Sequence, residues 1–154
     1  MAESLLFETA LKKAMALCAG REYCRSDIRQ KLSTWSVDET DAEKIISKLV
    51  TDKFIDEERY CTAFVRDKFR YNKWGRVKIA SALKMKKIPG ETINNALGSI
   101  DDETYMDALK EMIATQRRKV KAKNQYELKG KLLRFGLSRG FESHLLYDLL
   151  NENE

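Results

Sequence analysis

The sequence predicts an all-α protein, built as three tandem three-helix repeats that form an elongated array able to curve. One Pro and seven Gly in 154 residues favour helices over sheets. The 34% of charged residues favours a thin core over a compact one. Apolar residues recur in the same order three times along the chain. No segment alternates apolar and polar residues over the length of a strand.

The repeat is anchored by Leu32, Leu83 and Leu132, which are 51 and 49 residues apart. Six apolar columns align around these anchors without a gap. Apart from the anchors themselves, the columns are Ile28, Ile79 and Leu128; Val37, Ile88 and Leu137; Ile45, Ala96 and Leu145; Ile46, Leu97 and Leu146; and Leu49, Ile100 and Leu149. We therefore expect repeats over 1–54, 55–100 and 101–154.

Each repeat is expected to contain one long helix and two shorter ones. The long helices are predicted over 5–19, 56–71 and 101–118. The anchor and the residue four before it share one face of the second helix, and the last three columns form the apolar stripe of the third. Three residues suited to starting that third helix lie six positions after the anchors: Asp38, Pro89 and Ser138.

The start of the second long helix is the most clearly marked. Asp56 is placed to cap it, and Glu57 and Glu58 then face the positive end of the helix dipole. Ile55 and Tyr60 occupy the positions of a hydrophobic staple. Because consecutive carboxylates on a helix diverge by about 100°, this acidic run is typical of a helix start rather than of a metal site.

The net charge of +5 is concentrated in the middle of the chain. Residues 1–60 carry ten Lys and Arg against twelve Asp and Glu, 61–100 carry nine against two, and 101–154 carry ten against ten. A local surplus of +7 attracts phosphate backbones or acidic protein surfaces. A solvated helix face is the alternative explanation of the same pattern.

The residues predicted to contact a partner or nucleic acid come from this basic region. Three of them, at 66, 70 and 73, share a helix face. Trp74 either stacks on a base or lies in the seam between repeats, and we favour the seam. The full candidate set is Arg66, Arg70, Lys73, Trp74, Arg76, Lys78, Lys84, Lys86 and Lys87. A second basic cluster at 117–123 is given less weight, because cations suit the end of a helix anyway.

No catalytic residue, metal ligand set or cofactor site is predicted. His144 is the single histidine, and Cys18, Cys24 and Cys61 fit neither a zinc site nor a redox pair. We expect reduced thiols and a cytoplasmic protein that is not an enzyme. No apolar run has the length of a membrane span.

A set of motif positions extends over nearly the whole length of the chain. The first repeat contributes Asp27-Ile28 and Lys31-Leu32, and the third contributes the segment 129–150. The central motif positions are Asp56, Glu57, Arg59, Tyr60, Phe64, Val65, Gly75, Arg76, Leu83, Lys87 and Ile88. In these residues the chain resembles the RecX family of recombinase regulators. The chain departs from the family pattern at Ile55, where the family has Leu, and in keeping a single glycine, Gly75, near the turn.

The resemblance implies that the protein binds the RecA recombinase, chiefly as its filament on single-stranded DNA. It would lie in the groove of the filament and inhibit filament growth, ATP hydrolysis and strand exchange. We expect a monomer with no membrane partner, and direct contact with DNA is left open. One alternative is a general nucleic-acid-binding helical repeat protein without a dedicated recombinase partner. Another is a scaffold with no nucleic-acid role.

Overall fold

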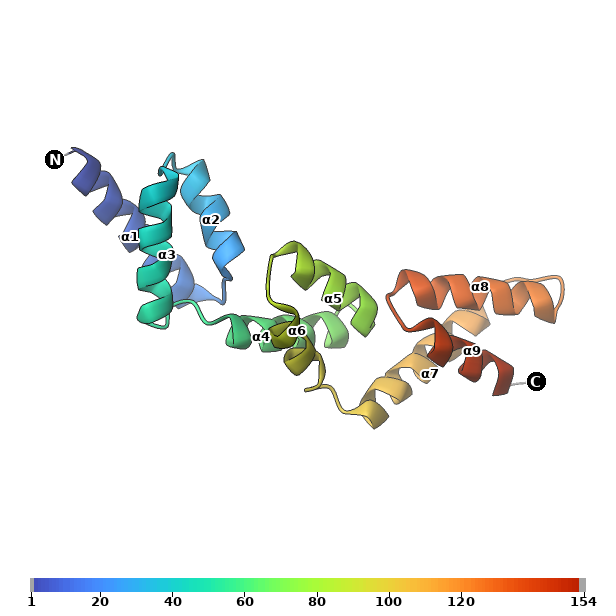
Figure 1. Cartoon of the computed structure of the whole chain (residues 1–154). Helices are drawn as coiled ribbons and strands as arrows, with labels where there is room; N and C mark the ends of the chain where they lie inside the picture. Colours follow the sequence, from blue (N-terminus) through green and yellow to red (C-terminus); the bar gives the residue numbers. More distant parts are fainter. Residues whose placement is uncertain (1, 153–154) are drawn as a thin grey trace. The chain divides into compact units, whose positions relative to one another are not determined.

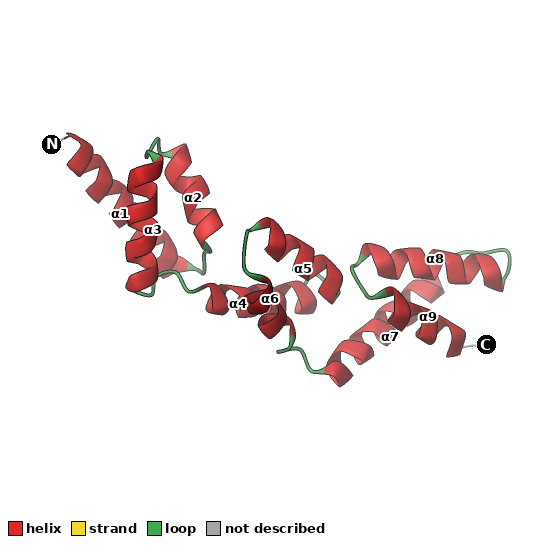
Figure 2. Cartoon of the chain, viewed as in Figure 1, coloured by secondary structure: helices red, strands yellow, loops and turns green. Residues whose placement is uncertain are grey.

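The computed structural model describes the backbone of residues 2–152 and the side chains of residues 6–151. This part of the chain is all α, with nine helices and no strand (Figures 1 and 2). The helices are α1 (Ala2–Gly20), α2 (Arg25–Thr34), α3 (Glu39–Thr51), α4 (Glu57–Arg70), α5 (Arg76–Met85), α6 (Gly90–Leu97), α7 (Asp102–Lys119), α8 (Gln125–Ser138) and α9 (Ser143–Glu152). The predicted fold class is confirmed, and α1, α4 and α7 match the three predicted long helices.

The chain forms two compact units. One contains the residues up to Ala63 together with Leu83–Ile93, and the other contains Phe64–Ala82 and the chain from Asn94 onward. Helices α4, α5 and α6 contribute residues to both units. The division into repeats at 1–54, 55–100 and 101–154, and the elongated shape, stay predictions.

The core of the first unit is formed by α1, α2 and α3. Leu11 and Ala14 from α1, Ile28 from α2 and Ile45 from α3 are all buried, and Ile55 extends the same cluster. The helix faces that carry these residues are those expected from the apolar columns. The packing of α3 beside both α1 and α2 is visible in Figure 1.

The core of the second unit is formed by α7, α8 and α9. Tyr105 and Leu109 from α7 pack with Leu132 from α8 and Leu146 from α9. The ring of Phe69, near the end of α4, stacks on Tyr105 with centroids 5.7 Å apart. This aromatic contact fixes the end of α4 in the unit that holds α7.

Acidic side chains start two helices where the sequence predicts them. Asp38 accepts a hydrogen bond from the Asp41 N–H at 2.8 Å, and Asp56 accepts one from the Arg59 N–H at 3.0 Å. Ile55 and Tyr60 are both buried, as a hydrophobic staple requires. The predicted cap and staple of α4 are therefore confirmed.

The prediction that Ser138 starts a helix is wrong. Ser138 is the last residue of α8, where its hydroxyl donates to the Phe135 carbonyl at 2.7 Å. Leu137, expected in an apolar column, is 44% exposed. In this repeat the second helix runs one turn further than in the others, and α9 begins at Ser143.

A backbone hydrogen bond that closes the end of the second helix occurs in all three predicted repeats, and its position in the third one reveals the extra turn. The Val37 N–H donates to the Leu32 carbonyl, and the Ile88 N–H donates to the Leu83 carbonyl. The corresponding bond in the third repeat runs from the Phe141 N–H to the Gly136 carbonyl, at 3.1 Å. Phe141 therefore takes the place that the ungapped alignment gave to Leu137.

Candidate partner interface

Arg76 holds the start of α5 inside the second unit. Its guanidinium lies over the Tyr105 ring, 3.8 Å from the centroid, and pairs with Asp102 at 2.7 Å and Glu142 at 3.2 Å. Its backbone N–H donates to the Tyr105 hydroxyl at 2.9 Å, and that hydroxyl donates to Glu142. The side chain is only 24% exposed. The charge of Arg76 is thus neutralised within the chain, which makes it a structural residue.

The same network raises the pKa of two of its members, Tyr105 and Arg76. Burial, together with the hydrogen bond to Glu142, raises the pKa of the Tyr105 hydroxyl. Desolvation lowers the pKa of Arg76, but its hydrogen bonds to Glu142 and Asp102 outweigh that and raise the pKa. Both groups therefore keep their protons across the physiological range.

Gly75 lies where two backbone segments touch. Its N–H donates to the Arg139 carbonyl at 2.7 Å, and the Val77 N–H donates to the Gly140 carbonyl at 2.9 Å. A Cβ on Gly75 would lie 2.4 Å from the Gly140 carbonyl oxygen, which is closer than atoms can approach. Gly140 itself has φ +89°, a conformation that favours glycine. The glycine at 75 is therefore required by the close approach of the α8–α9 loop.

Trp74 is half-buried and carries two cations on its ring. The ammonium groups of Lys68 and Lys78 lie 4.8 and 4.7 Å from the ring centroid. The backbone N–H of Trp74 donates to the Lys68 carbonyl at 3.0 Å, which fixes the loop after α4. The indole thus joins cations from α4 and α5. Whether Trp74 is a seam residue or a contact residue stays a prediction.

Three exposed cations of this unit lie on α4 and in the loop that follows it. Arg66, Arg70 and Lys73 are all exposed, and Tyr71 between them is 74% exposed. Arg66 is close to the carboxylate of its neighbour Asp67, at 3.4 Å. Within the described chain, Arg70 and Lys73 make no ion pair. We call these four residues, Arg66, Arg70, Tyr71 and Lys73, the α4 surface.

The remaining candidates, Lys84, Lys86 and Lys87, belong to the first unit. Lys86 pairs with Asp27 of α2, whose side chain is 12% exposed, so its charge is already compensated. Lys84 and Lys87 are exposed on either side of Met85, which is 83% exposed. The structure therefore assigns the nine candidates to two units and gives Arg76 and Lys86 partners inside the chain.

The other family-motif positions also support the fold. Glu57 accepts a hydrogen bond from the Arg25 N–H at 3.1 Å, and Arg59 forms an ion pair with Glu22. Leu83 and Ile88 are buried. Phe64 is half-buried, and the ammonium of Lys68 lies 5.5 Å from its ring centroid. The central family motif is thus largely a set of buried and hydrogen-bonded positions.

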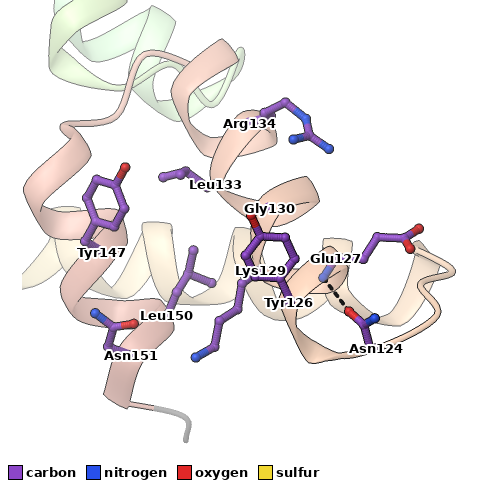
Figure 3. Close-up of a pocket in the computed structure, with 10 residues that line it drawn as sticks. All are labelled: Asn124, Tyr126, Glu127, Lys129, Gly130, Leu133, Arg134, Tyr147, Leu150 and Asn151. Atoms are coloured by element: carbon purple, nitrogen blue, oxygen red, sulfur yellow. Dashed lines mark hydrogen bonds between the residues drawn. The ribbon is translucent and has the colours of Figure 1, made fainter.

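The structure also shows a groove that the sequence reasoning missed. It lies between α8 and α9, with a volume of about 620 Å³, and Figure 3 shows Tyr126 and Tyr147 with Leu133 and Leu150 between them. Tyr126 is 89% exposed and Tyr147 is 52% exposed. The sequence signal for this region is the basic surplus of residues 117–139. The equal numbers of basic and acidic residues over 101–154 conceal that surplus.

The described part of the chain has neither a membrane-spanning helix nor a metal-binding cluster. None of its helices has both the length and the apolar character needed to cross a membrane. Among the same residues, His, Cys, Asp and Glu side chains form no group of three or more that could hold a metal ion.

Known proteins resemble this chain in sequence. The family model "RecX, second three-helix domain" matches residues 56–97. "Regulatory protein RecX" of Clostridium beijerinckii is 27% identical, covering 99% of this chain and 71% of the relative. The protein of the same description from Actinobacillus pleuropneumoniae serotype 5b is 29% identical, covering 95% of this chain and 96% of the relative.

Solved structures show the same fold. One titled "Crystal structure of regulatory protein RecX" matches with a TM-score of 0.88 at 22% identity, covering 98% of this chain and 74% of the other. RecX from Lactobacillus salivarius matches with a TM-score of 0.82 at 18% identity, covering 97% of both chains. The family-model match, the sequence relatives and the motif positions together show that the chain belongs to the RecX family of regulatory proteins.

Proposed function

We propose that this protein binds the RecA recombinase, chiefly as its filament on single-stranded DNA, and inhibits filament growth, ATP hydrolysis and strand exchange. The observation that carries the proposal is membership of the family: the relatives from Clostridium beijerinckii and Actinobacillus pleuropneumoniae, both described as regulatory protein RecX, match this chain over 99% and 95% of its length. No catalytic step is assigned to the chain itself.

The α4 surface is the part of the chain that we assign to the partner. The exposed cations Arg70 and Lys73 have no carboxylate partner among the described residues, and Tyr71 adds an exposed aromatic ring. Arginine and tyrosine are enriched at the centres of protein interfaces. Such a surface suits an acidic protein face or a phosphate backbone, and the filament offers both.

Charge reversal of the α4 surface tests this assignment. We expect Arg66, Arg70 and Lys73 together changed to Glu to weaken binding to RecA filaments by tenfold or more, because each cation becomes repulsive. Arg76 is left unchanged, because its loss would disturb the fold. The matched control changes the exposed Lys12, Lys44 and Lys110 to Glu, which alters the net charge equally. Equal binding of the triple variant and the control would contradict the assignment.

The alternative function, general binding of nucleic acid, is favoured by the clustering of cations in the sequence. A salt titration separates the two functions. A general binder would bind bare single strands as tightly as RecA-coated strands, with an affinity that falls steeply with salt. Our proposal predicts tighter binding to the coated strand at physiological salt.

A further inference from the structure

The third repeat contains a strongly basic segment that its balanced total hides. Residues 101–116 carry one basic and five acidic side chains, 117–139 carry nine basic and one acidic, and 140–154 carry four acidic and none basic. The surplus of +8 over 117–139 exceeds the +7 of 61–100 and lies in a shorter stretch. A concentrated positive potential of this kind attracts polyanions.

The structure places this segment beside the α8–α9 groove. Lys121 and Lys123 lie in the loop that leads into α8, and Lys129 and Arg134 line the groove itself. Within the described chain, Lys121, Lys123 and Arg134 make no ion pair with a carboxylate. Cations therefore lie both in the loop that leads to the groove and in the lining of the groove.

One carboxylate also lines the groove, and it is compensated. Glu127 pairs with Lys131 at 3.0 Å, and hydrogen bonding to Lys131 lowers the pKa of Glu127. The ammonium of Lys131 also donates to the Lys121 carbonyl at 2.7 Å. Lys131 thus holds the α7–α8 loop against α8 and offsets the charge of Glu127, so the net charge around the groove stays positive.

The groove combines two aromatic rings with leucine side chains. The exposed rings of Tyr126 and Tyr147 project from α8 and α9 (Figure 3). Leu150, at the floor, is only 4% exposed, so most of its surface already belongs to the core. Most of the exposed lining of the groove is apolar, and the two tyrosine rings present faces on which bases can stack.

We infer that the α8–α9 groove binds single-stranded nucleic acid. Bases stack on Tyr126 and Tyr147, and the cations at Lys121, Lys123 and Arg134 contact phosphates. Single strands are required, because the bases of a duplex are stacked on one another and cannot reach the rings. This goes beyond the proposed function, since it assigns direct nucleic-acid contact to a defined site that does not depend on RecA.

The stacking residue provides the first test. The full chain is titrated into a fluorescein-labelled 20-mer of thymidine, and binding is followed by anisotropy at low salt. We expect Tyr126→Ala to weaken binding about tenfold, while Tyr126→Phe, which keeps the ring, binds like the parent chain. Because Tyr126 is 89% exposed, both variants should keep the parent's helix content and melting temperature. Unchanged binding of Tyr126→Ala overturns the inference.

The cations provide the second test. Arg134→Glu should weaken binding and reduce the slope of log affinity against log salt by about 0.7, the value for one phosphate on a single strand. Lys110→Glu, an equal charge change at an exposed site on α7, should leave both quantities unchanged. Identical effects of the two variants would show that total charge, not this groove, determines binding.

Competition identifies the occupant. Unlabelled thymidine 20-mer should displace the probe, and duplex DNA or polyglutamate of equal charge should do so poorly. Displacement by polyglutamate at equal concentration would indicate an acidic peptide site and contradict the inference. If the groove variants lose single-strand binding but still inhibit RecA, both proposals stand. If they keep single-strand binding, the inference fails alone.

Discussion

Close backbone approach at Gly75 makes this residue a sensitive point of the second unit. A methyl group there would lie 2.4 Å from the Gly140 carbonyl oxygen and 2.6 Å from the Phe141 nitrogen, both backbone atoms. Because backbone atoms cannot rotate away, the α8–α9 loop would have to move. Such a shift would break the two hydrogen bonds that join it to the start of α5.

We therefore expect Gly75→Ala to lower the free energy of unfolding by about 2–4 kcal/mol. Urea denaturation followed by circular dichroism measures the change. The control is Gly90→Ala, because nothing lies within 4 Å of a Cβ on Gly90. That variant should be neutral or more stable by up to about 1 kcal/mol. Equal effects of the two substitutions would argue against the close approach.

The thiols are predicted to be unreactive in the folded chain. Desolvation raises the pKa of both Cys24 and Cys61 to about 11, and it also raises that of Cys18. The thiolate fraction of Cys24 and Cys61 at pH 8 is then about 100-fold below that of an ordinary cysteine. Ellman's reagent should label the native chain slowly and the urea-unfolded chain at once. Rapid labelling of all three thiols in the native chain would contradict the buried placement.

The same pKa shifts have a consequence for stability. A thiol whose pKa is raised by folding favours the folded state below its unfolded pKa of about 9. Above that pH the unfolded chain loses its thiol protons first, so this contribution declines as the pH rises toward about 11.

At the scale of single residues, the sequence could identify Arg76 as a cation but not its partners. Its contacts with Tyr105 and Glu142 join positions 29 and 66 residues away. No local pattern encodes such pairings, so the sequence could not show that this predicted contact residue is held by ion pairs within the chain. The helix face expected to hold residues 66, 70 and 73 is formed only by Arg66 and Arg70, because α4 ends at Arg70 and Lys73 lies in the loop that follows.

Among the helices, α4 has the start that local chemistry defines most completely. The Asp56 carboxylate accepts the Arg59 N–H at 3.0 Å and lies 3.9 Å from the Arg59 guanidinium. We expect Asp56→Ala to cost about 1 kcal/mol of unfolding free energy, because the first turn loses its cap. Asp56→Asn keeps the capping oxygen and should cost less than half of that. Equal losses for Ala and Asn would indicate that charge, not capping, is the source.

The helices were predictable because their signals are local, and the exception has a physical cause. The ungapped alignment placed Leu137 with Val37, whereas the structure aligns Phe141, four residues later. Four residues rotate a helix by about 400°, only 40° past a full turn. The apolar face therefore looks nearly the same with or without the extra turn, and the pattern alone could not detect it.

For the molecule as a whole, the choice of segments over which charge is summed decides which basic surfaces the sequence reveals. Summed by repeats, the basic surplus falls in the middle repeat and the third looks neutral. Divided at residue 117, in the last turn of α7, the third repeat contains a segment of +8 that runs to residue 139, beside an aromatic groove. Both charge totals can be counted from the sequence. The reason to divide the third repeat at this point comes from the positions of the helices and the groove in the structure.

The central claim is that this chain restrains RecA on DNA. It is tested most directly by the steady-state rate of ATP hydrolysis by RecA saturated with single-stranded DNA, measured while this protein is titrated in at physiological salt. We predict that the rate falls to a low plateau, and that the α4-surface triple variant needs about tenfold more protein to reach it. An unchanged rate at saturating concentrations of the parent chain would contradict the account.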